Sequence, residues 1–150
     1  MKKLLNLMLV VAFAIGFASC EQTELSDSKY EKKLEGEWSV TTINGTLMQD
    51  GVVLQEHTVN IPDGEMLQSV VFNFKKNGVL VETLVSADGE KEVEEAKYSV
   101  ADGKVVVYYE DEEPVELDIV DISNKNLTLK STIQYSSKQD AIVEIHFVKL

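Results

Sequence analysis

The amino-acid sequence predicts one all-β domain, in which eight antiparallel strands follow one another and close into an up-and-down barrel. Short segments alternate apolar with polar residues, as strands with one buried face do. Turn sequences rich in Gly, Asn and Asp separate most of these segments. No segment after residue 19 repeats its apolar residues with a helical period. Closure removes exposed strand edges, but a two-sheet β-sandwich fits the same strand order and is the alternative.

The first strand is predicted at Gly36–Ile43, which is rich in β-branched and aromatic residues. Asn44–Gly45 is a strong turn signal, so we expect the strand to end there. Residues 46–65 are less regular. They allow an extended segment over 52–54 before a turn at 62–64.

From residue 66 onward the rhythm is regular. Asn77–Gly78, Asp88–Gly89 and Asp102–Gly103 are turn signals between apolar runs, and an acidic run that ends at Pro114 is another. The remaining seven strands are predicted over residues 66–75, 79–85, 93–100, 104–110, 115–122, 127–134 and 141–150.

The alternation divides these strands into an inner and an outer face, because successive side chains of a strand point to opposite sides. The outer set is polar, which argues against a barrel that faces lipid. The predicted inward residues are Trp38, Val40, Val70, Phe72, Phe74, Ala96, Tyr98, Leu117, Ile119, Leu127, Leu129, Val143, Ile145 and Phe147. The predicted outward residues are Glu95, Lys97, Glu116, Asp118, Thr128, Lys130 and Glu144.

Residues 1–19 have the parts of an export signal: two lysines, an apolar stretch and small residues before a cysteine. The stretch Leu4–Ser19 has 16 residues, fewer than the roughly 18 that a transmembrane helix needs. The sequence Phe17-Ala18-Ser19-Cys20 resembles the lipobox of bacterial lipoproteins. This resemblance implies that Cys20 is acylated and begins the mature protein. Residues 20–33 are then an acylated cysteine with a flexible polar tether, and residues 34–150 form the barrel domain.

The mature chain would be strongly acidic. The full chain has 14 Lys+Arg and 26 Asp+Glu, so removal of Lys2 and Lys3 leaves 12 basic against 26 acidic residues, a net charge of −14. There is no arginine. Nucleic acid and anionic lipid headgroups should repel such a chain, so the acyl group has to supply any attachment to a membrane. Cys20 is the single cysteine, so no intramolecular disulfide can form.

The sequence Gly36-Glu37-Trp38, which opens the first strand of an eight-strand meander, resembles the Gly-x-Trp start of lipocalins. With the lipobox-like segment, the chain is similar to the lipocalin-like lipoproteins of the Bacteroides group. The opening segment also resembles that of META-type domains, whose Gly-Cys-Asn motif is missing here.

The lipocalin resemblance implies that Trp38 packs across a closed barrel end under an arginine near the last strand. This chain has no arginine, and Lys149 is the candidate to take its place, as a weaker partner because an ammonium lacks the planar fork. The resemblance to lipoproteins of the Bacteroides group implies a location in the bacterial cell envelope, at the periplasmic or surface face of the outer membrane. The candidate residues that line a ligand cavity are Trp38, Val70, Phe72, Phe74, Tyr98, Leu117, Leu129, Ile145 and Phe147.

No catalytic, metal-binding or cofactor-binding motif stands out. His57 and His146 are far apart in the sequence, and neither a nucleophile elbow nor a glycine-rich phosphate loop is present. Tyr98, Tyr108 and Tyr109 could orient a ligand at a barrel mouth. We therefore expect a non-enzymatic protein that holds a small, neutral, apolar molecule against an apolar wall with a few hydroxyls. The alternative is a structural or interaction lipoprotein with a filled barrel and a protein or glycan partner.

Overall fold

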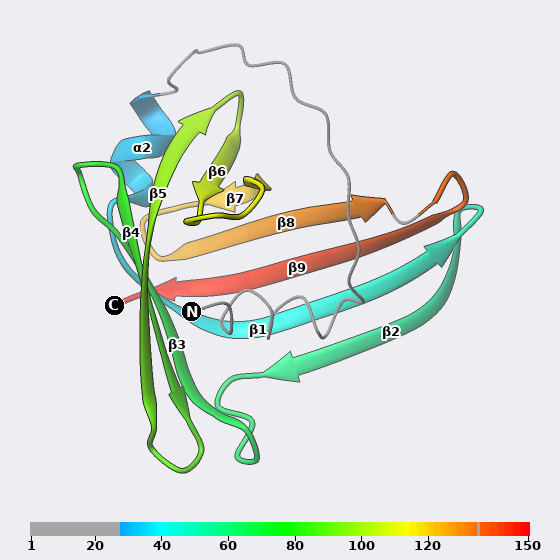
Figure 1. The fold of residues 1–150 in the computed structure, drawn as a ribbon, viewed down its shortest axis with the longest axis horizontal. Coiled ribbons are helices and arrows are strands. Elements are labelled where there is room, and N and C mark those ends of the chain that lie inside the picture. The colour runs from blue at the N-terminus through cyan, green and yellow to red at the C-terminus, as the bar shows by residue number, and fades with distance from the viewer. Residues whose placement is uncertain (1–27, 135) are drawn as a thin grey trace.

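The computed structural model describes residues 28–134 and 136–150, which form one short helix and nine strands (Figure 1). The helix is α2 (Ser28–Leu34). The strands are β1 (Gly36–Gln49), β2 (Val52–Asn60), β3 (Leu67–Phe74), β4 (Val79–Ser86), β5 (Lys91–Ala101), β6 (Lys104–Tyr108), β7 (Val115–Ile122), β8 (Asn126–Gln134) and β9 (Gln139–Lys149).

The strands form one antiparallel sheet that closes on itself. Their order is β2-β1-β3-β4-β5-β6-β7-β8-β9, and β1 also pairs with β9. The predicted eight-stranded up-and-down barrel is confirmed, and the ring closure rules out the sandwich. Strand β2 is an addition to the eight. It pairs with Thr42–Gln49 of β1, whereas β3 pairs with Gly36–Ser39 on the same edge of β1.

The two halves of the barrel differ in shape. Strands β1, β2, β8 and β9 run side by side and extend together, whereas β3, β4 and β5 run steeply across that direction (Figure 1). Helix α2 lies at the end of the barrel where β1 begins (Figure 1). At the opposite end, β1, β2, β8 and β9 extend together beyond β3, β4 and β5 (Figure 1).

The predicted turn at Asn44–Gly45 is wrong, because β1 continues through it to Gln49. The chain turns instead at Asp50 and Gly51, whose φ angles of 51° and 78° are those of a two-residue hairpin turn with positive φ at both positions. Asn44 remains in the strand, where its side chain accepts a hydrogen bond from Thr58 Oγ1 at 3.0 Å. Pairing with β2 and β9 on both edges stabilises this extension.

One short helix, Ser28–Leu34, was not predicted; it takes up the end of the predicted tether over residues 20–33. Leu34 is fully buried, and Tyr30 packs against the core. Seven residues make only about two turns, too few to show a helical period in the sequence. The export signal, Cys20 and the rest of the tether lie outside the described residues. Within the described part, no helix is long and apolar enough to cross a membrane.

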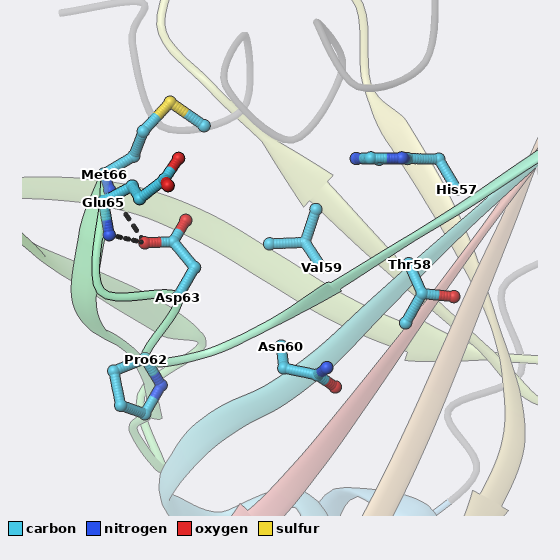
Figure 2. A pocket seen from close by; sticks show the side chains of 8 residues that line it. All are labelled: His57, Thr58, Val59, Asn60, Pro62, Asp63, Glu65 and Met66. Carbon is cyan, nitrogen blue, oxygen red and sulfur yellow. Dashed lines mark hydrogen bonds between the residues drawn. The ribbon is translucent and has the colours of Figure 1, made fainter.

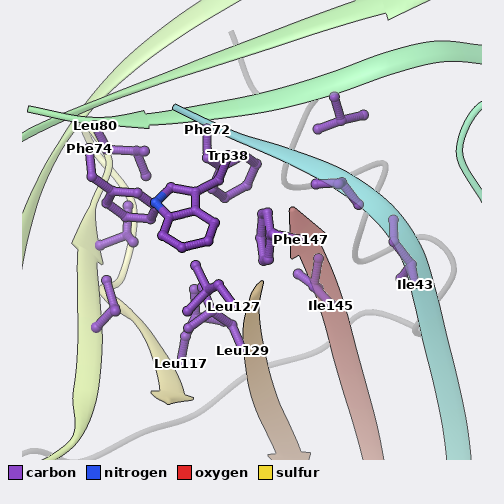
Figure 3. Packing of buried hydrophobic residues seen from close by; sticks show 14 of the residues in the cluster. Trp38, Ile43, Phe72, Phe74, Leu80, Leu117, Leu127, Leu129, Ile145 and Phe147 are labelled. Atoms are coloured by element: carbon purple, nitrogen blue, oxygen red, sulfur yellow. The ribbon is translucent and has the colours of Figure 1, made fainter. Parts of the chain in front are cut away.

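The predicted inner and outer faces are confirmed. The predicted inward residues are buried, except for Tyr98 and Ile119, which are partly buried against the same core. The predicted outward residues are all exposed or only partly buried. The core occupies the barrel interior, and its largest fully buried side chains are those of Trp38, Phe72, Phe74 and Phe147 (Figure 3).

Candidate functional site

The indole of Trp38 closes one end of the barrel. Its side chain is fully buried, and Nε1 donates a hydrogen bond of 2.7 Å to the carbonyl oxygen of Leu34, at the end of α2. The ammonium of Lys149 lies 4.9 Å from the centre of the indole, within the range of a cation–π interaction. The ammonium also donates hydrogen bonds to the carbonyl oxygens of Glu35 at 2.9 Å and Lys33 at 3.3 Å. Lys149, the candidate cation for this end, thus lies over Trp38.

Gly36 is required at this end for two reasons. Its φ angle is +119°, a conformation that residues with a side chain rarely adopt. A Cβ atom there would also lie 3.1 Å from Cε of Lys149, so the lysine side chain would have to shift by a few tenths of an ångström. Glycine thus lets the lysine side chain lie close to the backbone beside Trp38.

Aromatic side chains fill the region next to Trp38 (Figure 3). The rings of Phe72 and Phe147 meet edge to face with centroids 5.2 Å apart, and Phe74 and Tyr98 meet likewise at 5.1 Å. Tyr98 is only partly buried, and its hydroxyl donates a hydrogen bond of 2.7 Å to the carbonyl oxygen of Lys75. Its phenol therefore caps a backbone turn.

The structure brings the nine candidate lining residues together in the barrel. All except Tyr98 belong to the buried core. Trp38, Phe72, Phe74 and Phe147 lie together at the closed end (Figure 3), so side chains occupy that end.

One carboxyl group inside the barrel was not among the predicted site residues. Glu82 lies on β4 with 1% of its surface exposed. The hydroxyl of Tyr109 donates a hydrogen bond to its Oε1 atom, and Oε2 has no hydrogen-bond partner among the described residues. Burial raises the pKa of Glu82 to about 7; the bond from Tyr109 lowers it and Glu94 raises it. Burial and the nearby Glu82 raise the pKa of Tyr109 far above its ordinary value, so the phenol stays protonated. The expected wall of apolar groups and hydroxyls therefore also contains an acid.

A pocket of about 430 Å³ lies beside β2 (Figure 2). Its lining residues are His57, Thr58, Val59, Asn60, Pro62, Asp63, Glu65 and Met66. Val59 is paired with the buried Ile43, and His57 is paired with Gly45, so both lie in the inward phase of the sheet. In Figure 2 the His57 ring points toward the side of the pocket where Met66 lies.

The turn that borders this pocket is held by Asp63. Its Oδ1 atom accepts hydrogen bonds from the backbone N–H groups of Glu65, Met66 and Leu67 at 3.0, 2.7 and 2.8 Å. These bonds lower the pKa of Asp63, led by the one from Leu67. The turn is thereby fixed between β2 and β3, so the pocket has one well-ordered wall.

The two histidines lie on opposite faces of the sheet. His57 faces the pocket, whereas His146 lies on the outer face. Nε2 of His146 is 2.8 Å from Glu144 Oε1 and 3.2 Å from Asn44 Nδ2, and Nδ1 is 3.2 Å from Thr128 Oγ1. This network ties β8, β9 and β1 together. No group of three or more His, Cys, Asp or Glu residues in the described ranges could hold a metal ion.

Comparison with solved structures shows the same fold at low sequence identity. Apocrustacyanin C1 superposes with a TM-score of 0.59 and 16% identity, and lobster apocrustacyanin A1 with 0.58 and 16%; each match covers 83% of this chain and 64% of the crustacyanin. This chain thus spans less than two thirds of their length. A lipocalin-like protein from Bacteroides uniformis superposes with a TM-score of 0.50 and 15% identity over 79% of this chain and 99% of its own.

A comparison with curated proteins finds no match. The family model of the lipocalin-like domain matches residues 34–129, which is more than half of the chain and begins at the buried Leu34. This match agrees with the closed barrel and with the Trp38 end. The chain therefore belongs to the lipocalin-like domain family.

Proposed function

We propose that this protein is a non-catalytic binding protein that holds one small, largely apolar molecule in its barrel. The observation that carries this proposal is the asymmetry of the barrel. Trp38 and Lys149 close one end, whereas the inward residues of β2 border an open pocket at a distance from that end. Most of the residues that line this pocket are polar, so the pocket would serve as the mouth of the site and the apolar core of the barrel as its wall. Eight strands are just wide enough to hold one small ligand.

The proposal places the protein in the bacterial cell envelope, attached through a lipid on Cys20. Its support is the lipobox-like Phe17–Cys20 sequence after a basic and apolar start. The resemblance to lipoproteins of the Bacteroides group favours the outer membrane. Because the mature chain carries a large negative charge, acyl chains rather than basic residues would hold it at the membrane.

The interior favours a neutral ligand over a fatty-acid anion. The buried charged group is the acid Glu82, and the ammonium of Lys149 is already held by two backbone carbonyls above Trp38. Among residues 28–134 and 136–150 no buried cation is present to pair with a ligand carboxylate, and an unpaired carboxylate is costly in an apolar site.

The test is a displacement titration at pH 7 with the neutral fluorescent probe N-phenyl-1-naphthylamine. A monoacylglycerol should displace the probe saturably, and a fatty acid of the same chain length should do so less well. Val59→Trp should weaken probe binding because it fills the inward side of β2. Val53→Trp, the same change at a residue that is 48% exposed and away from the pocket, should leave binding unchanged. Tight fatty-acid binding would contradict the selectivity, and no saturable binding would contradict the function.

One observation favours a second candidate function, an interaction protein that binds a protein partner. Val52, Val53 and Leu54 are 63%, 48% and 53% exposed at the start of β2, and apolar groups gathered on a surface often mark an interaction site. A photo-crosslinking residue at Leu54 should then capture one protein in cells. The same residue at Val120, which is 53% exposed on β7, should not.

A further inference from the structure

The buried Glu82 occupies a position that the fold gives to an apolar residue. Its neighbours in the same phase of β4 are Leu80 and Leu84, which are 0% and 7% exposed. Across the sheet it is paired with Phe72 of β3, which is 2% exposed. Glutamate is almost never fully buried unless it has a partner. A carboxyl group at this place therefore needs a compensating interaction.

Only half of that compensation is present among the described residues. Tyr109, itself 7% exposed, donates its hydroxyl hydrogen to Oε1. Oε2 is buried and accepts no hydrogen bond. Buried polar groups are nearly always bonded, so an exception calls for a group that the structure does not contain. The free oxygen lies inside the barrel, where a ligand is proposed to bind.

The missing group should carry positive charge. The titratable groups around Glu82 are Tyr109 and, on β5, Glu94, which is directly opposite, and Glu92. Strand β3 contributes no titratable residue. The ion pairs found among the described residues, such as Lys104 with Glu116 and His146 with Glu144, do not involve Glu82. Glu92 and Glu94 have interactions of their own, and the described side chains that shift the pKa of Glu82 are a phenol and an acid. The acidic chain as a whole attracts cations.

The cation should be organic. A hard metal ion would require several oxygen ligands, and no group of three or more acidic, histidine or cysteine residues in the described part could hold one. The side chains beside the carboxyl are instead apolar: Phe72, Leu80 and Leu84. An ammonium group on an apolar body matches both features, since the N–H groups reach Oε2 and the body covers the rings and methyl groups.

We propose that Glu82 and Tyr109 form a polar anchor inside the barrel that binds the amino group of a small apolar amine, with Oε2 of Glu82 accepting a hydrogen bond from the ammonium. This inference rests on the proposed ligand-binding function and specifies the class of ligand. Tyr109 holds the carboxyl in place through Oε1. Burial keeps the pKa of Glu82 near 7 in the empty protein, and a bound ammonium lowers it by favouring the ionised carboxylate.

The test compares three competitors that share one chain and differ in head group: octylamine, 1-octanol and octanoate. Each displaces N-phenyl-1-naphthylamine from the purified protein at pH 7. Octylamine should act at a concentration at least about tenfold lower than octanol, because it adds a charge-assisted hydrogen bond. Octanoate should be the weakest of the three. This comparison uses the unmodified protein, so it does not depend on the folding of any variant.

Two matched variants locate the effect. Glu82→Gln keeps the size of the side chain and removes the charge, and it should reduce the preference for octylamine over octanol to about threefold or less. Glu95→Gln makes the same change on the exposed outer face of β5 and should keep the full preference.

The anchor is overturned if octylamine binds the unmodified protein no more tightly than octanol, or if Glu82→Gln keeps the preference for octylamine over octanol. Either result would leave the binding function intact. If the probe and the three competitors all fail to bind saturably, the binding function is contradicted and the anchor with it.

Discussion

Replacing Glu82 by glutamine removes an ionisable group from the barrel interior and keeps an oxygen that can accept the hydrogen bond of Tyr109. The pKa of Glu82 is raised from 4.5 to about 7, chiefly by burial. In the folded protein the carboxyl holds its proton up to about pH 7, whereas the unfolded chain releases it near pH 4.5. Between these values folding takes up a proton, so the free energy of unfolding falls as the pH rises.

The size of this effect follows from the two pKa values. Each pH unit between them is worth about 1.4 kcal/mol, so the ligand-free protein loses about 3 kcal/mol of stability from this group once the pH is above 7. Glu82→Gln has no such loss. The variant should exceed the unmodified protein by about 1 kcal/mol or less at pH 5 and by about 3 kcal/mol at pH 8.

Urea unfolding of both proteins from pH 5 to pH 8, followed by the fluorescence of the single tryptophan, measures this difference. The exposed Glu95→Gln should follow the unmodified protein at every pH. Parallel pH profiles for Glu82→Gln and the unmodified protein, or a variant that is less stable at pH 8, would refute the reasoning that Glu82 is buried without full compensation.

Three further predictions concern the closed end of the barrel and the lipid attachment at Cys20. Trp38→Ala should lower the free energy of unfolding by about 3–5 kcal/mol, measured by circular dichroism in urea; a loss below about 1 kcal/mol would place the indole outside the core. Gly36→Ala should cost about 1 kcal/mol more than Gly64→Ala, because both glycines have positive φ but only a Cβ at Gly36 would meet Lys149; equal losses in the same urea assay would show that this contact does not matter. Cys20→Ser should abolish the incorporation of a fatty-acid analogue in cells, and label that persists in the variant would exclude Cys20 as the acylated residue.

The strand pattern predicted most of the fold, because a strand with one polar and one apolar face can turn only its apolar face toward the core. The inward orientation of Trp38, Phe72 and Phe147 followed from the alternation of apolar and polar residues alone, and these side chains are buried. The turn at Asn44–Gly45 could not be excluded in this way, because its chemistry matches that of Asp50–Gly51. Pairing decided between them, since β1 gains partners on both edges by extending to Gln49. Such long-range pairing is not visible in a local sequence pattern.

The acid in the interior was missed for a related reason. In β4 the residues Val79, Val81 and Val85 alternate with Leu80, Glu82 and Leu84, so both faces are largely apolar and the pattern does not say which one turns inward. One signal was available: an outward Glu82 would have taken Leu80 and Leu84 to the surface with it. Tyr109 comes directly after β6 and is followed by an acidic run. Acidic neighbours are typical of an exposed turn, so the sequence gave no sign that Tyr109 is buried. Only the closed barrel brings that hydroxyl to Glu82.

Native mass spectrometry of the purified protein tests the central claim, that the barrel binds a small molecule, most directly. We expect a fraction of the protein to carry one additional small molecule, released on denaturation and neutral or amine-bearing rather than a fatty acid. That fraction should decrease when N-phenyl-1-naphthylamine is added and should be smaller in Val59→Trp. A single mass equal to that of the protein alone, together with no saturable uptake of the probe, would contradict small-molecule binding by the barrel.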